Sequence, residues 1–195
     1  MNYLAHLYLA SNEPLSLVGN LMGDFVKGNQ FSEYPNEIIF GIQQHRAIDK
    51  FTDQHQEVIN LKQWLSPQRK RFSGIISDIV FDHFLAKHWS QYSQHTLETF
   101  SQSVYQKLKP SLATMPPLMQ TMVTRMISQD WLCHYVALSS TGQAIDGVSR
   151  RIRFPNQLSG AIEEVELHYD EYERVFNHFF PQLILFNDTL VKNPD

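Results

Sequence analysis

Apolar residues recur every three to four positions along almost the whole chain, the spacing that places them on one face of an α-helix. Leu15, Val18, Met22 and Phe25 show this spacing clearly. No convincing alternation of apolar and polar residues indicates a strand. The pattern predicts helices over residues 3–10, 15–28, 35–65, 69–89, 96–109, 117–138, 142–151 and 158–190. Pro181 is expected to break or kink the last of these helices.

These helices predict an all-α fold, a compact helical bundle in a single domain over residues 1–195. A coiled coil is not expected because no seven-residue repeat persists. No stretch approaches the ~20 apolar residues of a membrane span, and the first residues lack the basic start of a signal peptide. Cys133 is the single cysteine, so no intrachain disulfide is possible. These features fit a cytoplasmic protein.

Histidines and aspartates interrupt the apolar faces of four segments in the first half of the chain. A charged group that faces a core is costly unless something pairs with it. Several such groups converging from different helices indicate a metal ion, and a metal ion indicates hydrolytic chemistry. The residues concerned are His6, Asp24, His45, Asp49, Asp78, Asp82 and His83.

The segment 38–53 carries an apolar stripe that turns polar. Ile38, Ile42, His45 and Asp49 follow the spacing i, i+4, i+7, i+11 and share one helix face. His45 and Asp49 are one turn apart, so they can bind one ion together. The alternative is that they bind each other as a hydrogen-bonded pair inside a helix contact.

Asp78 and Asp82 share a helix face in the same way. Two carboxylates one turn apart repel each other when both are ionised, and a divalent cation would relieve that repulsion. The alternative pairs one aspartate with Arg46, Lys50 or Lys87 and leaves the other in solvent. Neighbouring residues on a helix differ in direction by about 100°, so His83 is interpreted as a group that supports a ligand from behind or as an acid/base group, rather than as a ligand.

Three further positions are candidates for the site: Asp24, His6 and His88. Asp24 precedes Lys27 and Gly28, a cation and a helix breaker that suit a loop facing a phosphate. A lone histidine such as His6 is more often a satisfied core residue, and its position matters only together with the others. His88 serves either as a cation at a helix end or as part of a pocket.

The donor set mixes imidazole and carboxylate without thiolate. Such a set suits Mn²⁺, Mg²⁺, Fe²⁺ or Zn²⁺ in an open catalytic site, and its carboxylates favour the harder ions. The absence of Glu-x-x-His argues against a ferritin-like di-iron bundle. Without a P-loop, Gly-x-Gly-x-x-Gly or Gly-x-Ser-x-Gly, nucleotide-loop and serine-hydrolase functions lack support.

The formal net charge of −4 argues against a general nucleic-acid binder. Two local basic clusters, Arg69–Arg71 and Arg150–Arg153, stand out against this balance. Either cluster can form a patch for an acidic partner, although solvated loop and helix-end charges are the more ordinary interpretation.

Five stretches of the chain, in order and at matching spacing, resemble the acyl carrier protein phosphodiesterase family, also called acyl carrier protein hydrolase. They are Asn2–Leu7, Gly23–Gly28, Gly41–Asp49, Thr52–Asp53 and Asp78–Trp89. The resemblance is strong over the first half, whereas the second half shares only its helical character and Trp131. It implies a helical fold related to the HD-domain phosphohydrolases, removal of the 4′-phosphopantetheine arm from holo-acyl carrier protein, and dependence on Mn²⁺.

One departure from the general HD signature affects the ligand assignment. HD proteins carry a His-Asp doublet, whereas this chain has Asp82-His83, so ligands are not carried over from them. The helix faces and the family motifs together give a metal-ligand hypothesis. Most of the ligands would be His6, Asp24, His45 and Asp82, with Asp49 and Asp78 as further ligands or orienting carboxylates.

The same resemblance suggests roles around the phosphodiester. Asp24 belongs to the catalytic set, Lys27 and Arg46 would stabilise charge on the phosphoryl oxygens, and His83 or His88 would protonate the leaving alkoxide. Holo-acyl carrier protein is the expected partner, with no nucleic acid or membrane. Acyl carrier proteins are acidic, so the two basic clusters are candidate docking surfaces. Two other functions remain open: an HD-type phosphohydrolase acting on a nucleotide, and a non-enzymatic helical binding module with a buried polar network.

Overall fold

The computed structural model describes residues 1–28 and 31–192, and every regular element in them is a helix. The predicted all-α class is therefore confirmed. The α-helices are α1 Tyr3–Leu9, α2 Pro14–Met22, α3 Asn36–Gln54, α4 Gln56–Asn60, α5 Ser73–Lys87, α6 Trp89–Tyr92, α7 Leu97–Leu108, α8 Pro117–Ser128, α9 Trp131–His134, α10 Leu138–Arg151, α11 Ile162–Leu167 and α12 Tyr169–Lys192. Short 3₁₀ turns η1 Leu61–Trp64, η2 Lys70–Phe72 and η3 Lys109–Thr114 connect some of them.

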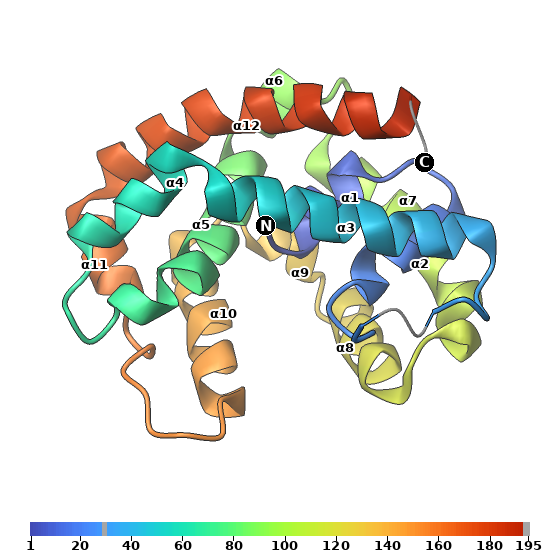
Figure 1. Ribbon diagram of the computed structural model, residues 1–195, viewed down its shortest axis with the longest axis horizontal. Coiled ribbons are helices and arrows are strands. Elements are labelled where there is room, and N and C mark those ends of the chain that lie inside the picture. The colour runs from blue at the N-terminus through green and yellow to red at the C-terminus, as the bar shows by residue number, and fades with distance from the viewer. Residues whose placement is uncertain (29–30, 193–195) are drawn as a thin grey trace.

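The long helices α3 and α12 run side by side across the molecule, and α5 packs against α1, α10 and α12 (Figure 1). Aromatic side chains join α5 to α12: the Phe81 ring lies 5.5 Å from Phe179 and 5.7 Å from Phe176, centre to centre. These rings are fully buried. Burial of such large apolar surfaces is the main stabilising contribution to this core.

Helix boundaries depart from the predicted ones where the chain turns locally. The predicted helix 35–65 ends at Gln54, because His55 adopts an extended conformation with φ −72° and ψ 122°. The predicted helix 117–138 is divided at Asp130, which has the left-handed φ of 46° that aspartate tolerates better than most residues. The predicted helix 69–89 starts later, at Ser73, after the 3₁₀ turn η2.

Of the break or kink expected at Pro181, the break is wrong, because α12 continues through this residue. Pro181 lies on the exposed face of the helix, where water can bond the carbonyl group that a proline leaves without a donor. The separation of the 158–190 segment into two helices occurs earlier instead, at His168, between α11 and α12. Within residues 1–28 and 31–192, no helix is long and apolar enough to cross a lipid bilayer.

Glycines allow α2 and α3 to approach each other very closely. A Cβ atom on Gly19 would lie 2.5 Å from the carbonyl oxygen of Ile38, and one on Gly41 would lie 2.8 Å from the backbone of Gly19. A side chain on Gly23, just after α2, would overlap the ring of His45. The close crossing therefore brings the end of α2 against the polar face of α3.

A buried amide network fixes α1, α2, α3 and α12 relative to one another. The Gln44 side chain donates to Leu9 O (3.0 Å) and to Asn187 Oδ1 (2.7 Å). Its own Oε1 accepts from Asn20 Nδ2 at 2.8 Å. Buried amides that are paired in this way hold one relative arrangement of helices, because any slip leaves a polar group without a partner.

Candidate metal centre

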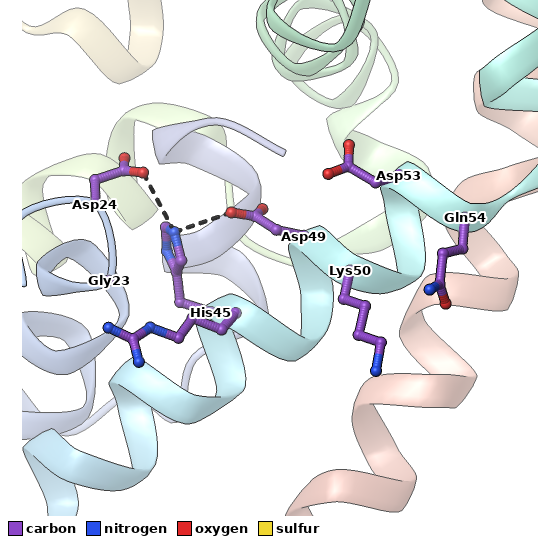
Figure 2. A pocket seen from close by; sticks show the side chains of 8 residues that line it. Gly23, Asp24, His45, Asp49, Lys50, Asp53 and Gln54 are labelled. Atoms are coloured by element: carbon purple, nitrogen blue, oxygen red, sulfur yellow. Dashed lines mark ion pairs between the residues drawn. The ribbon is translucent and has the colours of Figure 1, made fainter. Parts of the chain in front are cut away.

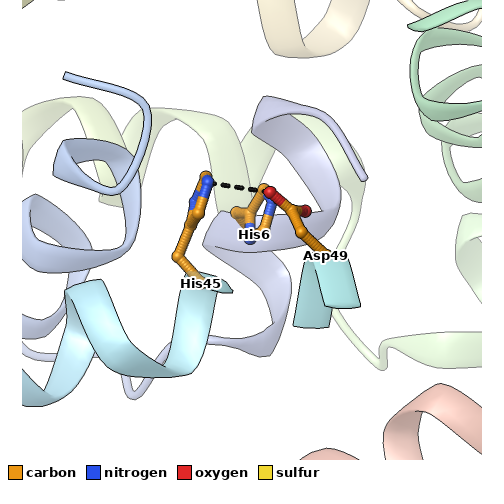
Figure 3. A group of neighbouring side chains, drawn as sticks. All are labelled: His6, His45 and Asp49. Atoms are coloured by element: carbon orange, nitrogen blue, oxygen red, sulfur yellow. Dashed lines mark hydrogen bonds and ion pairs between the residues drawn. The ribbon is translucent and has the colours of Figure 1, made fainter. Parts of the chain in front are cut away.

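His6 on α1 and His45 and Asp49 on α3 form a tight group, here called the histidine–aspartate cluster (Figure 3). Nε2 of His6 lies 3.1 Å from Asp49 Oδ1, and Nε2 of His45 lies 3.1 Å from Asp49 Oδ2. The two imidazole rings stack with centres 3.8 Å apart. Potential ligand atoms of the three residues all lie within 4.8 Å of one another. Both histidines are buried, whereas Asp49 is about one-third exposed, at 35%.

Asp82 positions α1, and with it His6, through the backbone. Its Oδ2 accepts from Leu4 N at 2.8 Å and its Oδ1 accepts from Ala5 N at 3.0 Å, so a carboxylate caps the N-terminal turn of α1. Burial raises the pKa of this carboxyl group to about 7, against the opposing effect of the two N–H groups. Both oxygens of Asp82 serve the backbone, and Asp82 is not part of the group of donors that lie within 4.8 Å of one another. Its expected place among the principal ligands stays a prediction.

Asp24 reaches the cluster from a turn rather than from a helix. The predicted helix 15–28 ends at Met22, where the N–H groups of Phe25 and Val26 both bond to the Met22 carbonyl. Asp24 follows in this turn, with 53% of its side chain exposed and Oδ1 3.4 Å from His45 Nε2 (Figure 2). The carboxylates of Asp24 and Asp49 therefore flank the same imidazole nitrogen.

Asp78 lies beside the cluster and is bound to the α-ammonium group of Met1. That nitrogen donates to Asp78 Oδ1 at 2.7 Å and to Asp49 Oδ1 at 3.1 Å. The suggested pairing of Asp78 or Asp82 with Arg46, Lys50 or Lys87 is not found among the described contacts.

Opposite electrostatic effects act on the two stacked histidines. Burial, and then the positive charge of His45, lower the pKa of His6 to about 4. Burial would lower the pKa of His45 as well, but hydrogen bonds to Asp24 and Asp49 outweigh it and raise this pKa to about 9. Burial opposes ionisation of Asp49, and the hydrogen bonds from His45 and His6 reverse this and hold its pKa well below the usual range.

The donor chemistry of the histidine–aspartate cluster fits a divalent cation. Two imidazole nitrogens and a carboxylate converge, with the exposed carboxylate of Asp24 nearby, and no thiolate takes part. The Nδ1 atoms of His6 and His45 are buried and have no hydrogen-bond partner among the described residues. Each ring is therefore held mainly through the nitrogen that faces Asp49. A cation would take the place of the proton that the acidic groups now share with His45.

Two hollows meet at the cluster. A smaller hollow of about 430 Å³ is lined by Gly23, Asp24, His45, Arg46, Asp49, Lys50, Asp53 and Gln54 (Figure 2). A larger cleft of about 1020 Å³ extends between the N-terminal segment, α5 and the α8–α10 region. Asp24 and Asp49 line both, so these carboxylates lie where the two spaces join.

The two predicted phosphate-binding cations differ in position. Arg46 lines the smaller hollow, and its guanidinium donates to Gly28 O at 2.8 Å and Val26 O at 2.7 Å. Arg46 thereby holds the turn that follows Asp24. Lys27 is exposed and is not among the residues that line either hollow.

His83 and His88 are not brought to the histidine–aspartate cluster. They belong to a second group, here called the α5–α12 cluster, made of His83, Lys87, His88, Tyr169 and Glu173. In it, His83 bonds to Tyr135 O (2.8 Å) and to the Tyr169 hydroxyl (2.8 Å), and His88 lies 2.6 Å from Glu173. None of the five lines either hollow. Their predicted role as proton donors has no support from this placement.

Sequence reasoning did not anticipate the wall of the larger cleft that α8, α9 and α10 provide. Arg125, Trp131 and Gly147 belong to it, and they come from three different helices. The local signals are the basic cluster Arg150–Arg153 and the small residues Ala144 and Gly147 of α10, which a sequence alone does not connect to α5 or to Asp49.

Residues 1–183 match the family described as "Acyl carrier protein phosphodiesterase". The chain is similar to proteins of that name from Klebsiella pneumoniae strain 342 (38% identical), Pectobacterium atrosepticum (37%) and Photorhabdus laumondii (34%), in each case over 185 residues. These alignments cover 94% of this chain and 93–96% of the relatives. No solved structure matches the chain, so the expected relation to HD-domain proteins stays a prediction.

Proposed function

Because the chain belongs to the acyl carrier protein phosphodiesterase family, and is thus a phosphoric diester hydrolase, we propose that it removes the 4′-phosphopantetheine arm from holo-acyl carrier protein. The products are apo-acyl carrier protein and free phosphopantetheine. The observation that carries the metal-dependent form of this proposal is the histidine–aspartate cluster: three metal-type donors from two helices meet within 4.8 Å where two hollows join.

His6, His45 and Asp49 would hold a divalent metal, Mn²⁺ in the first place and Mg²⁺ or Fe²⁺ as alternatives. When bound, such a cation polarises a phosphoryl oxygen and lowers the pKa of a nearby water. The α-ammonium group of Met1 bonds to both Asp78 and Asp49. Through this shared partner, Asp78 would help to orient the Asp49 carboxylate. Asp82 holds α1 in place and thereby sets the direction of His6.

Asp24 has the geometry to act on the attacking water. Its carboxylate is half exposed, lines both hollows and lies 3.4 Å from His45 Nε2. A carboxylate with this access can accept the proton of a water held beside it. The water oxygen bonds to phosphorus while the bond between phosphorus and the serine oxygen of the carrier protein breaks, and the serine oxygen takes up a proton from solvent. Arg46 lines the same hollow and contributes positive charge near the phosphate.

The carrier protein is proposed to dock on Arg150–Arg153 rather than on Arg69–Arg71. The Arg69 guanidinium is already committed, because it donates to Glu164, Gln157 O and Ser159 O at 2.7–2.8 Å. Arg150 and Arg151, in contrast, are exposed and line the larger cleft. Exposed cations at the rim of a site attract an acidic partner and accelerate its association.

Mass spectrometry of holo-acyl carrier protein after incubation with the enzyme tests the proposal. With Mn²⁺ present we expect loss of the arm and appearance of free phosphopantetheine, and with excess chelator we expect intact holo-protein. Nucleotides incubated in parallel test the HD-type phosphohydrolase function. Intact holo-protein in every condition would reject the proposal, and turnover of a nucleotide alone would replace it.

A further inference from the structure

The larger cleft has more room than hydrolysis at the histidine–aspartate cluster requires. At about 1020 Å³ it extends from Asp49 and Asp78, beside Ile75 and Ile79 of α5, to the α8–α10 wall. Hydrolysis of a phosphodiester needs room at the carboxylates for one phosphate and one water. The rest of the cleft is therefore available for a substituent of that phosphate.

Gly147 keeps one wall of this cleft open. A Cβ atom there would meet only Arg150 Nη2, at 3.8 Å, which is ordinary contact. Gly142, one and a half turns earlier on α10, differs because its Cβ would lie 2.9 Å from the Ile162 side chain. Helix packing accounts for Gly142 but not for Gly147. Glycine inside a helix costs stability relative to alanine, and no packing contact of the described residues offsets this cost at Gly147.

The lining changes in character along the cleft. The end near Asp49 is acidic, whereas the side walls present apolar groups such as Ile79 and Val148 and the amides of Gln129 and Gln143. Three cations, Arg125, Arg150 and Arg151, also line the cleft. The amide and apolar groups, taken without these cations, suit an uncharged, flexible chain that carries its own amides and apolar groups, with its phosphate at the carboxylate end.

We propose that the larger cleft binds the pantetheine part of the arm, and that the small side chain of Ala144 and the lack of a side chain at Gly147 leave room for it. This inference rests on the proposed function and adds where the arm lies. The arm has two amides for the amide side chains of the walls and a gem-dimethyl group for the apolar ones. Held in this way along the cleft, it fixes the phosphorus over Asp24 and Asp49.

Gly147→Trp tests the proposal, because its side chain would extend from the wall into the larger cleft. We expect the affinity for free phosphopantetheine, measured by calorimetry with Mn²⁺ present, to fall at least about tenfold. KM for holo-acyl carrier protein should rise by a similar factor, with a smaller change in kcat. Binding of Mn²⁺ and of apo-acyl carrier protein, which lacks the arm, should stay as in the wild type. Gly147→Ala adds a single carbon and should give a much smaller change.

Ser139→Trp is the matched control, because Ser139 is exposed on α10 and lines neither hollow. It should leave phosphopantetheine affinity and KM unchanged. If Gly147→Trp fails to fold, Gln143→Trp fills the same cleft from an exposed position on the same helix.

The results separate the two proposals. Wild-type enzyme that leaves holo-protein intact rejects the proposed function. Wild-type enzyme that removes the arm, together with a cleft-filled variant that binds phosphopantetheine and holo-protein equally well, rejects the arm site alone. A cleft-filled variant that loses affinity for apo-protein to the same extent also rejects it, because the cleft would then be a docking groove for the carrier protein itself.

Discussion

Two groups of histidines and acids, the histidine–aspartate cluster and the α5–α12 cluster, use the same residue types in different ways. In the first, two imidazoles turn the same nitrogen toward one carboxylate at the junction of two hollows. In the second, Lys87 and His88 both bond to Glu173, at 2.8 Å and 2.6 Å. Positive and negative groups balance there, away from both hollows. Residue type is therefore a weak indicator of a site, whereas convergence of donors on open space is a strong one.

The largest expected difference between the clusters concerns activity. Asp49→Asn removes a metal ligand, and we expect kcat/KM for holo-acyl carrier protein to fall by about 10³-fold or more, with loss of Mn²⁺ binding. Glu173→Gln is the matched change in the α5–α12 cluster and should keep kcat/KM within about threefold of the wild type. Steady-state kinetics compare the two. Equal losses would place the α5–α12 cluster in the chemistry and refute the distinction.

Asp82 lies near the histidine–aspartate cluster, but its two oxygens accept hydrogen bonds from the backbone of α1. Asp82→Asn turns one acceptor into a donor that faces an N–H group. We expect the free energy of unfolding of the metal-free protein to fall by about 1–3 kcal/mol. Urea unfolding in chelator measures it. If Asp82 were purely a metal ligand, metal-free stability would stay the same and only Mn²⁺ affinity would fall.

The two basic clusters should also differ in what they contribute to KM for the carrier protein, by about 1 kcal/mol. Replacing Arg150 and Arg151 together by alanine should raise KM about 5- to 20-fold at low salt and much less at high salt, because exposed charges are screened. Lys70→Ala, an exposed change in the other basic cluster, should alter KM less than twofold. A KM series against salt concentration is the measurement. A larger effect at Lys70 would move the docking surface to Arg69–Arg71.

The smallest expected effect is a pH dependence in the α5–α12 cluster. Burial alone would raise the pKa of Glu173, but hydrogen bonds from Lys87 and His88 outweigh it and lower this pKa below 4.5. A lowered folded-state pKa contributes stability above the unfolded value, and that contribution is lost as the pH falls through the folded value. Glu173→Gln should therefore cost under about 1 kcal/mol at pH 7, and this cost should shrink as the pH falls through the folded-state pKa of Glu173. A cost that grows toward pH 3 would contradict this assignment.

The sequence predicts the helices well because their periodic apolar faces are a local property. It predicts their ends less well, since the turn at His55 and the left-handed Asp130 depend on how neighbouring helices pack. Pro181 shows the same limit, because solvent exposure, which the sequence does not state, decides whether a proline interrupts a helix.

At the site, too, local spacing predicts some contacts, whereas others depend on how the helices pack. His45 and Asp49 are one turn apart on a single helix, so their proximity follows from spacing alone. His6 joins them only through the tertiary placement of α1, which stacks its ring on that of His45; the family motifs suggested this proximity and periodicity could not. The directions of Asp82 and His83 were not predictable, because each depends on which neighbour lies across the helix: the start of α1 for Asp82, and Tyr135 and Tyr169 for His83.

The most direct test of the metal centre is an Mn²⁺ titration of chelator-treated protein, followed by electron paramagnetic resonance, with arm removal assayed at each point. We predict that activity rises in step with bound Mn²⁺ in the wild type, and that His45→Ala neither binds the ion tightly nor recovers activity. Full arm removal by metal-free wild type, or undiminished Mn²⁺ binding by His45→Ala, would contradict it.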